Sequence, residues 1–528
     1  MSKYLGLDFS TQSASAVLLD VEKGETVWEK SFPFAEYFPH YNTENGILKG
    51  ANGEVLSPPL MWTESLEYIV EQMKKDGVDL AEIKAISGSG QQHGSVYLNN
   101  SWLDTLANLN TSEGLVAQLK GVFSREHSPI WMDTSTSTEC EEIESAVPSI
   151  AQLTGSAATM RFTGPQIRKF YKTENEGYAN TETIHLVSSF MASLLIGKNA
   201  GIDHADGSGM NLMDLEKHDW NGELLNATAP ELISKLPKCV SPSHVVGKIA
   251  PYWVDRFGFN SETDVIAFSG DNPCSLIGLG LSNASEAAIS LGTSDTYFGI
   301  SDKLIVSEEG EGHVFASPST GYMSLICFVN GSLAREKVRE HYQLSWEDYE
   351  KALAQTKCGN NGKIMLPYFD EEITPASKHA QVYRFGLNES EAEANCRAVL
   401  EAQFLSMRLH SSWMSKPDSI SITGGASQNS SILQIIANIF GAKVKKLKTT
   451  GGAGLGAALR AYQAHQGCEW SDVFNDFIEY DEKTYTPDPL AHSLYEDLLK
   501  VYSACEEYSI ASGSDPESER LGFINRWK

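Results

Sequence analysis

Short apolar runs that end in polar turns recur along the chain between segments of helical periodicity, and this alternation predicts an α/β fold. Residues 4–20 indicate a strand, a tight polar turn and a second strand. The turn contains Asp8, Ser10, Thr11 and Gln12. Residues 287–300 repeat the arrangement around a turn that runs from Gly292 to Thr296. Two hairpins of one kind, far apart in the chain, predict a duplicated fold, although each alone is typical of an ordinary surface turn.

The junction at residues 264–281 predicts a strand that meets a helix. Val265 to Phe268 is an apolar run of strand length, and a small, apolar helical segment starts at Pro273. Proline is favoured at the first helical position, so Asn272 is predicted as the N-cap. Asp271 would then lie one residue outside the helix, with its carboxylate free near the positive end of the helix dipole. The alternative is that Asp271 is merely part of a turn.

A second strand end is predicted in residues 83–98, where glycines precede Gln91, Gln92 and His93. Open α/β sheets bind ligands at the carboxyl ends of their strands. The glycine spacing is one residue too long for a dinucleotide-binding loop, and the segment after Gly94 resembles a strand, so we exclude that class of site. His93 alone is also typical of a structural histidine.

Other segments predict helices, loops and a tail. Residues from Pro59 to about Lys75 indicate a helix, and residues 186–196 a buried helix too short to span a bilayer. Residues 419–443 indicate a strand that ends at Thr423, two glycines and then an amphipathic helix. Glycines 451–456 begin a further helix and suit close helix packing. The residues from Ser509 onward are polar and predict a loosely held tail.

Three polar loops supply groups suited to a polyhydroxylated ligand. They are the segment around Trp131 and Asp133, the segment that begins at Arg161, and residues 203–211. Each loop is weak evidence alone, because such residues occur wherever chains turn. Trp131 offers an aromatic face for a sugar ring.

Composition narrows the classes of partner. The chain has 528 residues and a formal net charge of -28, which opposes binding to nucleic acid or anionic membranes. The cysteines are scattered without metal-ligand spacing, which favours reduced thiols in a cytoplasmic protein. A domain boundary is predicted near residues 258–263, which gives domains at 1–258 and 259–510 and a tail at 511–528.

The combination of turns and acids fits phosphoryl transfer. No P-loop sequence occurs, but two polar hairpin turns can hold a phosphate chain through hydroxyl and backbone N–H groups. Asp8 could hold Mg²⁺, usually through water, and Asp271 could accept the proton of an attacking hydroxyl. The two acids are thus predicted to have different roles.

The ordered motifs LGLDFSTQS, SLGTSDT, GDNP and TGGASQN resemble the FGGY carbohydrate kinases over nearly the whole chain. That resemblance implies two actin-like, ribonuclease H-like ATPase domains with a cleft between them, and ATP and Mg²⁺ as cofactors. The motifs SGQQHGSVY, WMD, RFTG, DGSGMN and GDNP look most like the branch that phosphorylates D-xylulose to D-xylulose 5-phosphate. The expected protein is a monomer or homodimer that binds a small sugar and ATP.

The resemblance also assigns residues. It implies that the ketose contacts His93, Arg161, Asp271 and Asn272, and we expect Gln92, Trp131 and Asp133 beside them. It implies a nucleotide site at Gly424, Gly425, Ala426, Asn429 and Trp346, with phosphate turns at Thr11, Gln12, Gly292 and Thr293 and the metal at Asp8. Asp271 matches the general base. Two alternatives stay open: a family member specific for another pentulose or for a polyol such as ribulose or glycerol, and an actin-like ATP-binding module without catalysis.

Overall fold

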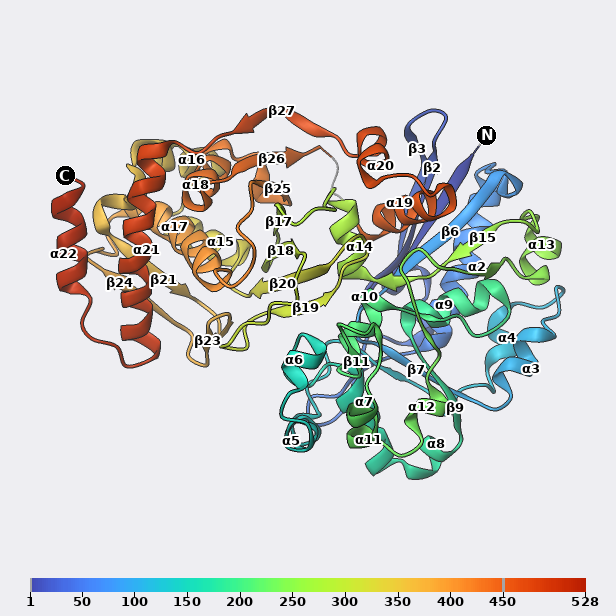
Figure 1. Ribbon diagram of the computed structural model, residues 1–528. Helices are drawn as coiled ribbons and strands as arrows, with labels where there is room; N and C mark the ends of the chain where they lie inside the picture. Colours follow the sequence, from blue (N-terminus) through green and yellow to red (C-terminus); the bar gives the residue numbers. More distant parts are fainter. Residues whose placement is uncertain (1, 449–451) are drawn as a thin grey trace. The chain divides into compact units, whose positions relative to one another are not determined.

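The computed structural model describes residues 2–448 and 452–528 and divides into two compact units (Figure 1). The first unit contains Met1–Ser282, Val314–Met323 and Gly451–Ile478. The second contains Asn283–His313, Ser324–Thr450 and Glu479–Lys528. The units are therefore discontinuous in sequence, because a late segment of the chain returns to the first one.

The central sheet of the first unit has the strand order β14-β15-β6-β1-β2-β3, and β16 also pairs with β6. The strand β1 pairs with β2 in antiparallel and with β6 in parallel orientation. The strands are β1 (Lys3–Phe9), β2 (Ser13–Asp20), β3 (Glu25–Pro33), β6 (Ile83–Gly90), β14 (Val245–Lys248), β15 (Asp264–Ile266) and β16 (Ser269–Gly270).

The alternation of side chains along β1 determines what covers each face of this sheet. Leu5 and Leu7 join a core with residues of α2 (Pro59–Lys75) and α9 (Val187–Ile196). Tyr4 faces the other way, toward Ala461 of α19 (Ala453–Gln466). On that face a Cβ atom on Gly6 would lie 2.1 Å from the carbonyl oxygen of Gly454, so both glycines permit close packing.

The remaining elements of the first unit surround this sheet and form a smaller helical layer beside it. The layer has its own apolar core of residues from β7, α5, α7 and α11. The elements are α1 (Phe34–Tyr37), η1 (Pro39–Tyr41), β4 (Leu48–Lys49), β5 (Val55–Ser57), η2 (Leu80–Glu82), β7 (Ser95–Asn99), α3 (Trp102–Ala107), α4 (Leu115–Leu119), β8 (Ser128–Pro129), α5 (Ser137–Ala146), α6 (Ile150–Thr154), α7 (Thr163–Thr173), α8 (Asn175–Ala179), β9 (Thr181–Leu186), β10 (Ile202–Asp203), α10 (His204–Gly207), η3 (Ser208–Met210), β11 (Met213–Asp214), β12 (Asp219–Trp220), α11 (Gly222–Thr228), α12 (Leu232–Lys235), β13 (Cys239–Val240), α13 (Pro251–Phe257), α14 (Asp271–Gly278) and α20 (Trp470–Phe477).

The second unit repeats the central pattern of the first. Strand β17 (Glu286–Leu291) pairs antiparallel with β18 (Asp295–Ser301) and parallel with β25 (Ser419–Thr423). The relation of β1 to β2 and β6 is the same, so the duplication predicted from the two hairpins is present in the structure. The sheet continues on both sides in the order β20-β18-β17-β25-β26-β27.

Helices α15 to α18, α21 and α22 contribute to the second unit's core. The bounds of these helices and of the remaining elements of this unit are β20 (Tyr322–Phe328), α15 (Ser332–His341), α16 (Trp346–Gln355), η4 (Cys358–Gly362), β21 (Ile364–Tyr368), β22 (Glu372–Ile373), β23 (Ala376–Ser377), β24 (Gln381–Phe385), α17 (Ala392–His410), η5 (Gly425–Gln428), α18 (Ser430–Phe440), β26 (Lys443–Leu447), β27 (Tyr480–Tyr485), α21 (Pro489–Ile510) and α22 (Glu517–Arg526). The strand β19 (His313–Ala316) lies mostly in the segment Val314–Met323 of the first unit.

The C-terminal residues correct one expectation from the sequence. Residues 517–526 form the helix α22, in which Phe523 is buried, so these residues are not a loosely held tail. Arg520 of this helix donates a hydrogen bond to the carbonyl oxygen of Gly362. The polar composition of this segment did not reveal that Phe523 packs in the apolar core and that Arg520 is hydrogen-bonded. These contacts hold the helix against the rest of the unit.

Several predicted helices are present. The helix at 59–75 has the predicted bounds, and every residue of α9 is buried as expected for residues 186–196. Gly451 lies outside the described residues, whereas Gly454 and Gly456 make the close contacts expected of them. None of the helices formed by residues 2–448 and 452–528 is long and apolar enough to cross a membrane.

Candidate active site

Asp8 is a buried acid near the end of β1 whose carboxylate is held by serine hydroxyls. It is 8% exposed, and its two oxygens accept hydrogen bonds from Ser89 Oγ at 2.7 Å and Ser10 Oγ at 2.6 Å. The strand register explains this position, because Asp8 is paired with Ser89 on β6. Burial raises the pKa of Asp8, and the hydroxyl donors offset part of that increase.

Asp271 begins α14, and here the predicted N-cap is wrong. Gly270 is the N-cap, so Asp271, Asn272 and Pro273 occupy the first three helical positions. Proline costs little anywhere in the first turn, since none of these N–H groups has an intrahelical partner. Pro273 therefore indicates the first turn of the helix and does not identify its first residue.

The carboxylate of Asp271 is anchored through one oxygen. Its Oδ1 accepts hydrogen bonds from the backbone nitrogens of Asn272 at 2.9 Å and Gln92 at 3.2 Å. Asn272 Nδ2 also donates to Gln92 Oε1 at 3.0 Å. Burial, and then the negative charge of Asp8, raises the pKa of Asp271 to about 7. Near neutral pH this acid can therefore accept a proton and later release it.

His93 adjoins the same strand end. Its ring stacks on Phe162 at a centroid distance of 4.0 Å, and its Nδ1 lies 2.7 Å from the carbonyl oxygen of Gly209. A carbonyl only accepts, so Nδ1 carries the proton in this contact. The residue has a φ of 71°, a left-handed conformation that is unusual outside glycine. Beside it, Gln92 Nε2 is buried without a hydrogen-bond partner among the described residues.

Arg161 and the Trp131 loop lie on other elements of the same unit. Arg161 is half-buried in the turn that precedes α7. Trp131 is 42% exposed and donates from Nε1 to Thr11 Oγ1, so two predicted site residues are joined. Gln12 is exposed in the same turn as Thr11.

Asp133 has a structural role in its loop. It is 1% exposed, and its Oδ1 accepts from Gln166 Nε2 at 2.8 Å and from the backbone nitrogen of Ser135 at 2.9 Å. Its Oδ2 accepts from the backbone nitrogen of Val55 at 3.1 Å. These bonds fix the loop that carries Trp131, and direct contact of Asp133 with a sugar stays a prediction.

The second unit contains a cavity of about 610 Å³ that brings together four of the five residues predicted to bind adenosine. It is lined by Ser332, Arg335, Glu336, Trp346, Glu347, Tyr349, Glu350, Gly425, Ala426, Gln428, Asn429 and Ile432. Trp346 is 56% exposed there, and the guanidinium of Arg339 lies 4.8 Å from the centroid of its ring. An exposed, buttressed indole of this kind can stack on a flat base.

Backbone geometry explains the glycines beside this cavity. Gly424 has a φ of 95°, and a Cβ atom there would lie 2.2 Å from the carbonyl oxygen of Leu291. A Cβ atom on Gly425 would meet nothing within 4 Å, so the backbone is open to a ligand at that point. Asn429 is the N-cap of α18 and accepts from Ser431 N at 2.9 Å.

The turn at Gly292 and Thr293 is held by an ion pair that we did not predict from the sequence. Thr293 is exposed, whereas Asp295 at the end of the turn is 1% exposed. Arg335 binds both carboxylate oxygens of Asp295, at 2.7 and 3.0 Å. This bidentate geometry fixes the turn next to a residue that also lines the cavity.

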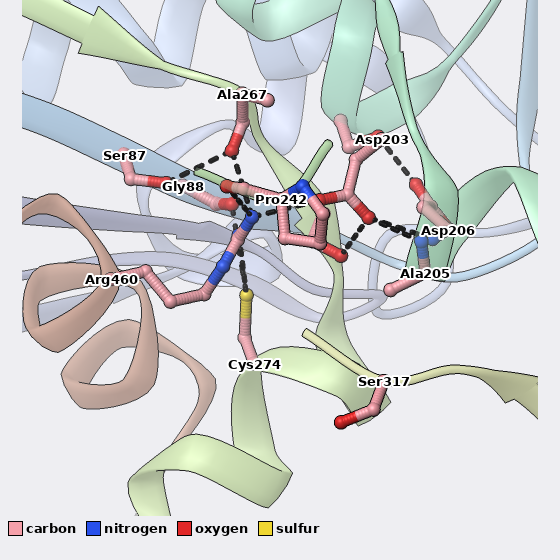
Figure 2. Close-up of polar contacts among 12 residues, drawn as sticks. Ser87, Gly88, Asp203, Ala205, Asp206, Pro242, Ala267, Cys274, Ser317 and Arg460 are labelled. Atoms are coloured by element: carbon pink, nitrogen blue, oxygen red, sulfur yellow. Dashed lines mark hydrogen bonds and ion pairs between the residues drawn. The ribbon is translucent and has the colours of Figure 1, made fainter. Parts of the chain in front are cut away.

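Sequence reasoning also missed a buried polar cluster in the first unit, at α10, α14 and α19 (Figure 2). It contains Asp203, Asp206 and Arg460, which are all at least 98% buried. Asp206 accepts a hydrogen bond from Ser188 through Oδ2, while its Oδ1 is buried without a partner among the described residues. A charged side chain within an apolar helical stretch, as at Arg460, is the sequence signal that could have revealed the cluster.

The donor set of the first unit suits an oxygen-preferring cation held through water. The described residues contain no group of three or more His, Cys, Asp or Glu side chains arranged to hold a metal ion. Asp8 nevertheless presents a buried carboxylate, and Mg²⁺ commonly keeps several water ligands while one or two carboxylates hold it. Asp8 thus fits a magnesium ion held together with phosphate oxygens, without a cage of protein ligands.

Sequence comparison with known proteins identifies related carbohydrate kinases. The N-terminal domain of the FGGY family of carbohydrate kinases matches residues 127–278, and the C-terminal domain matches residues 287–465. The chain is 43% identical over 490 residues to xylulose kinase 2 of Arabidopsis thaliana, with 87% of each chain covered. It is 40% identical over 532 residues to the xylulose kinase of Rattus norvegicus, with 97% of this chain and 98% of that one covered.

The fold is also similar to solved structures. Ligand-bound xylulose kinase from Lactobacillus acidophilus superposes with a TM-score of 0.80 at 21% identity. That match covers 97% of this chain and 99% of the other. The likeness shows the two-domain, actin-like and ribonuclease H-like fold expected from the sequence.

Proposed function

The chain belongs to the FGGY family of carbohydrate kinases, and we propose that it transfers the γ-phosphoryl group of ATP to the terminal hydroxyl of D-xylulose. The products are D-xylulose 5-phosphate and ADP. The observation that carries the proposal is the 40% identity to the rat xylulose kinase over 97% of the chain. The raised pKa of Asp271, at the junction predicted to bind the ketose, agrees with this chemistry.

The proposed reaction is an in-line displacement. The terminal hydroxyl oxygen of the sugar bonds to the γ-phosphorus, and the bond from that phosphorus to the β,γ-bridging oxygen breaks. The hydroxyl proton passes to Asp271 Oδ2, because Oδ1 is occupied by the Gln92 and Asn272 nitrogens. ADP retains the electrons of the broken bond. Asp271 also orients the hydroxyl, since in a loose transition state positioning matters more than early proton removal.

The other site residues have binding roles in this proposal. His93, Arg161 and Asn272 contact the ketose, with Gln92 and Trp131 beside them. Gly424, Gly425, Ala426, Asn429 and Trp346 bind adenosine, while Thr11, Gln12, Gly292 and Thr293 hold the phosphate chain. Asp8 would hold Mg²⁺, directly or through water, and bound Mg²⁺ would neutralise charge on the phosphate oxygens.

We further propose that the protein acts in the cytoplasm as a monomer or homodimer. All eight cysteines lie in the described part of the chain and none forms a disulfide, which agrees with that compartment. Light scattering coupled to gel filtration would measure the mass in solution, and a mass above that of two chains would contradict the proposal.

The function is tested by ADP release with MgATP across D-xylulose, L-xylulose, D-ribulose, L-ribulose and glycerol, beside a control without sugar. We expect a strong preference for D-xylulose. Preference for another polyol would contradict the substrate while leaving the kinase reaction in place. Sugar-independent ADP release would contradict the kinase function and favour an ATP-binding module.

A further inference from the structure

The guanidinium of Arg460 joins several segments of the first unit at one buried point (Figure 2). Arg460 lies on α19 and is 2% exposed. Its Nη2 donates to Asp203 Oδ2 at 2.8 Å and to the carbonyl oxygens of Pro242 at 2.9 Å and Ala267 at 3.1 Å. Its Nη1 lies 3.5 Å from the sulfur of Cys274. The planar guanidinium group of Arg460 thus contacts acceptors from separate parts of the chain.

Asp203 connects Arg460 to the polar loop at residues 203–211. Its Oδ1 caps α10 by accepting from the backbone nitrogens of Ala205 at 2.6 Å and Asp206 at 3.0 Å. Ser269 Oγ also donates to this oxygen at 2.9 Å. The oxygen that binds Arg460 and the oxygen that caps the loop belong to one carboxylate, so Arg460 and the loop share one anchor.

Cys274 and Ala267 connect Arg460 to the helix that carries Asp271. Cys274 lies in α14 one turn after Asp271, and Ala267 lies between β15 and β16 just before that helix. The carbonyl of Ala267 also accepts from Ser87 Oγ at 3.2 Å. The strand predicted at 265–268 ends at Ile266, so Ala267 lies in the break that follows it.

The two connected segments meet directly behind Asp271. A Cβ atom on Gly270 would lie 2.8 Å from Asp206 Oδ1 and 3.0 Å from Gln92 Cγ. Asp206, Gly270 and Gln92 are therefore in close contact, with no space for a side chain between them. Gln92 in turn contacts Asp271 and Asn272 through hydrogen bonds.

The cluster also brings buried acidic groups close together. Burial, with the charges of Asp203 and Asp271, raises the pKa of Asp206 well above its usual value, and the positive charge of Arg460 opposes that increase. An arginine is suited to this position because it keeps its charge when buried and bonds in several directions within one plane.

We propose that Arg460 is a positioning residue for the sugar site, which sets the spacing between the Asp203–Asp206 loop and the Asp271 helix. It acts through Asp203, Ala267 and Cys274 and does not contact the sugar. The inference rests on the proposed function, which assigns the Asp271 helix to the sugar site, and on the prediction that the polar loop at residues 203–211 suits a polyhydroxylated ligand. Its tests compare variants with the wild-type protein on whichever sugar that protein phosphorylates, so failure of the substrate assignment stays distinguishable.

The first test is Arg460→Lys, which keeps the charge and loses the planar fork. Small displacements of reacting groups reduce rates strongly, so we expect kcat/KM for the sugar to fall about tenfold or more through a higher KM for the sugar and a lower kcat. The KM for MgATP should stay within about twofold, because the described hydrogen-bond partners of Arg460 include none of the residues predicted to bind the nucleotide. The matched control is Arg397→Lys, since Arg397 in α17 also binds a carboxylate, Glu401, and carbonyl oxygens while buried. The Arg397→Lys variant should have the same KM for the sugar as the wild-type protein.

The second test separates positioning from charge balance. Arg460→Gln alone leaves Asp203 unpaired and should lower the melting temperature, whereas Arg460→Gln with Asp203→Asn removes both charges and should recover much of it. We expect the double variant to remain defective in sugar KM and kcat although it is folded. A double variant with wild-type kinetics, or an Arg460→Lys variant whose sugar and ATP constants change equally, would overturn the proposal.

Discussion

Trp131 donates a hydrogen bond from its indole nitrogen to Thr11 Oγ1 across 2.8 Å. Trp131 follows β8, and Thr11 lies in the turn between β1 and β2. The bond thus links the aromatic residue expected beside the sugar to the turn expected to hold phosphate. Since Trp131 is 42% exposed, the bond is accessible to water and should contribute modestly to stability.

Trp131→Phe should therefore affect kinetics more than stability. The ring face is retained while the link to Thr11 is lost, and a typical hydrogen bond contributes about 1 kcal/mol, or roughly fivefold in an equilibrium. We expect kcat/KM for MgATP to fall by about three- to tenfold in steady-state assays. Trp102→Phe is the control, because Trp102 Nε1 donates in the same way to Asn199 Oδ1 within a buried core. Equal kinetics for the two variants would remove the functional role from the bond.

Asp271→Asn should abolish most turnover while ATP binding is retained. The substitution preserves the oxygen that accepts from Gln92 and Asn272 but removes the proton acceptor. Loss of a general base costs about 10²- to 10⁴-fold, so we expect kcat to fall at least ~10²-fold. Calorimetric titration with a non-hydrolysable ATP analogue checks that binding persists. A variant with near wild-type turnover would refute the assignment of Asp271.

The raised pKa of Asp271 predicts the acid limb of the pH profile. The group must be ionised to accept a proton, so activity should fall as pH drops below its pKa of about 7. We expect kcat/KM for the sugar, which reports the free enzyme, to decline about tenfold per pH unit well below this value. The expected limb is contradicted if kcat/KM is constant from pH 5 to 8 in folded protein.

The sequence predicted the elements that depend on local pattern. The hairpins that contain Asp8 and Thr293, and the helix at 59–75, follow from the pattern of apolar and polar residues. This pattern can be recognised within a short stretch of sequence. The glycine motif at 424–425 also lies where its strand-to-helix pattern predicted it. These local elements could therefore be predicted before any tertiary structure was known.

Long-range partnerships were not predictable in the same way. Arg460 and Asp203 are 257 positions apart, and the sequence around each residue does not indicate that the other is its partner. The pairing arises because the chain returns to the first unit at residues 451–478. The misplaced N-cap at Asn272 has a smaller cause, since proline is tolerated throughout the first helical turn and fixes the start of a helix only approximately.

Trp346→Ala tests the cavity of the second unit. The indole is 56% exposed with Arg339 over its ring, and its removal should take away a stacking surface for the base. Stacking of a base on an aromatic side chain contributes about 1 to 3 kcal/mol, so the KM for ATP should rise roughly five- to 150-fold with little change in sugar KM. Trp470→Ala in α20 is the control, because its ring stacks on Phe474 away from the cavity. An unchanged KM for ATP would place the base elsewhere.

His410 forms a buried ion-pair network in the second unit. Its Nδ1 lies 2.8 Å from Glu311 Oε1, and its Nε2 lies 2.8 Å from Glu506 Oε2. Burial alone would lower the pKa of His410, but hydrogen bonds to these carboxylates more than offset that effect and raise it to about 9. The charged ring thus joins the end of α17 to α21 and to the segment before β19.

This network predicts that the free energy of unfolding decreases at alkaline pH. A histidine whose pKa is raised in the folded state contributes full stability below its unfolded pKa of about 6.5, and loses that contribution as pH rises through about 9. A shift of this size corresponds to about 3 kcal/mol. Urea unfolding at pH 6, 8 and 10 should therefore show a decline for the wild-type protein that is smaller in His410→Gln, which is already destabilised at pH 6. His341→Gln is the control, since His341 is exposed and lies 3.8 Å from Glu389, and it should follow the wild-type curve. Parallel curves for His410→Gln and wild type would show that His410 does not carry this charge in the folded protein.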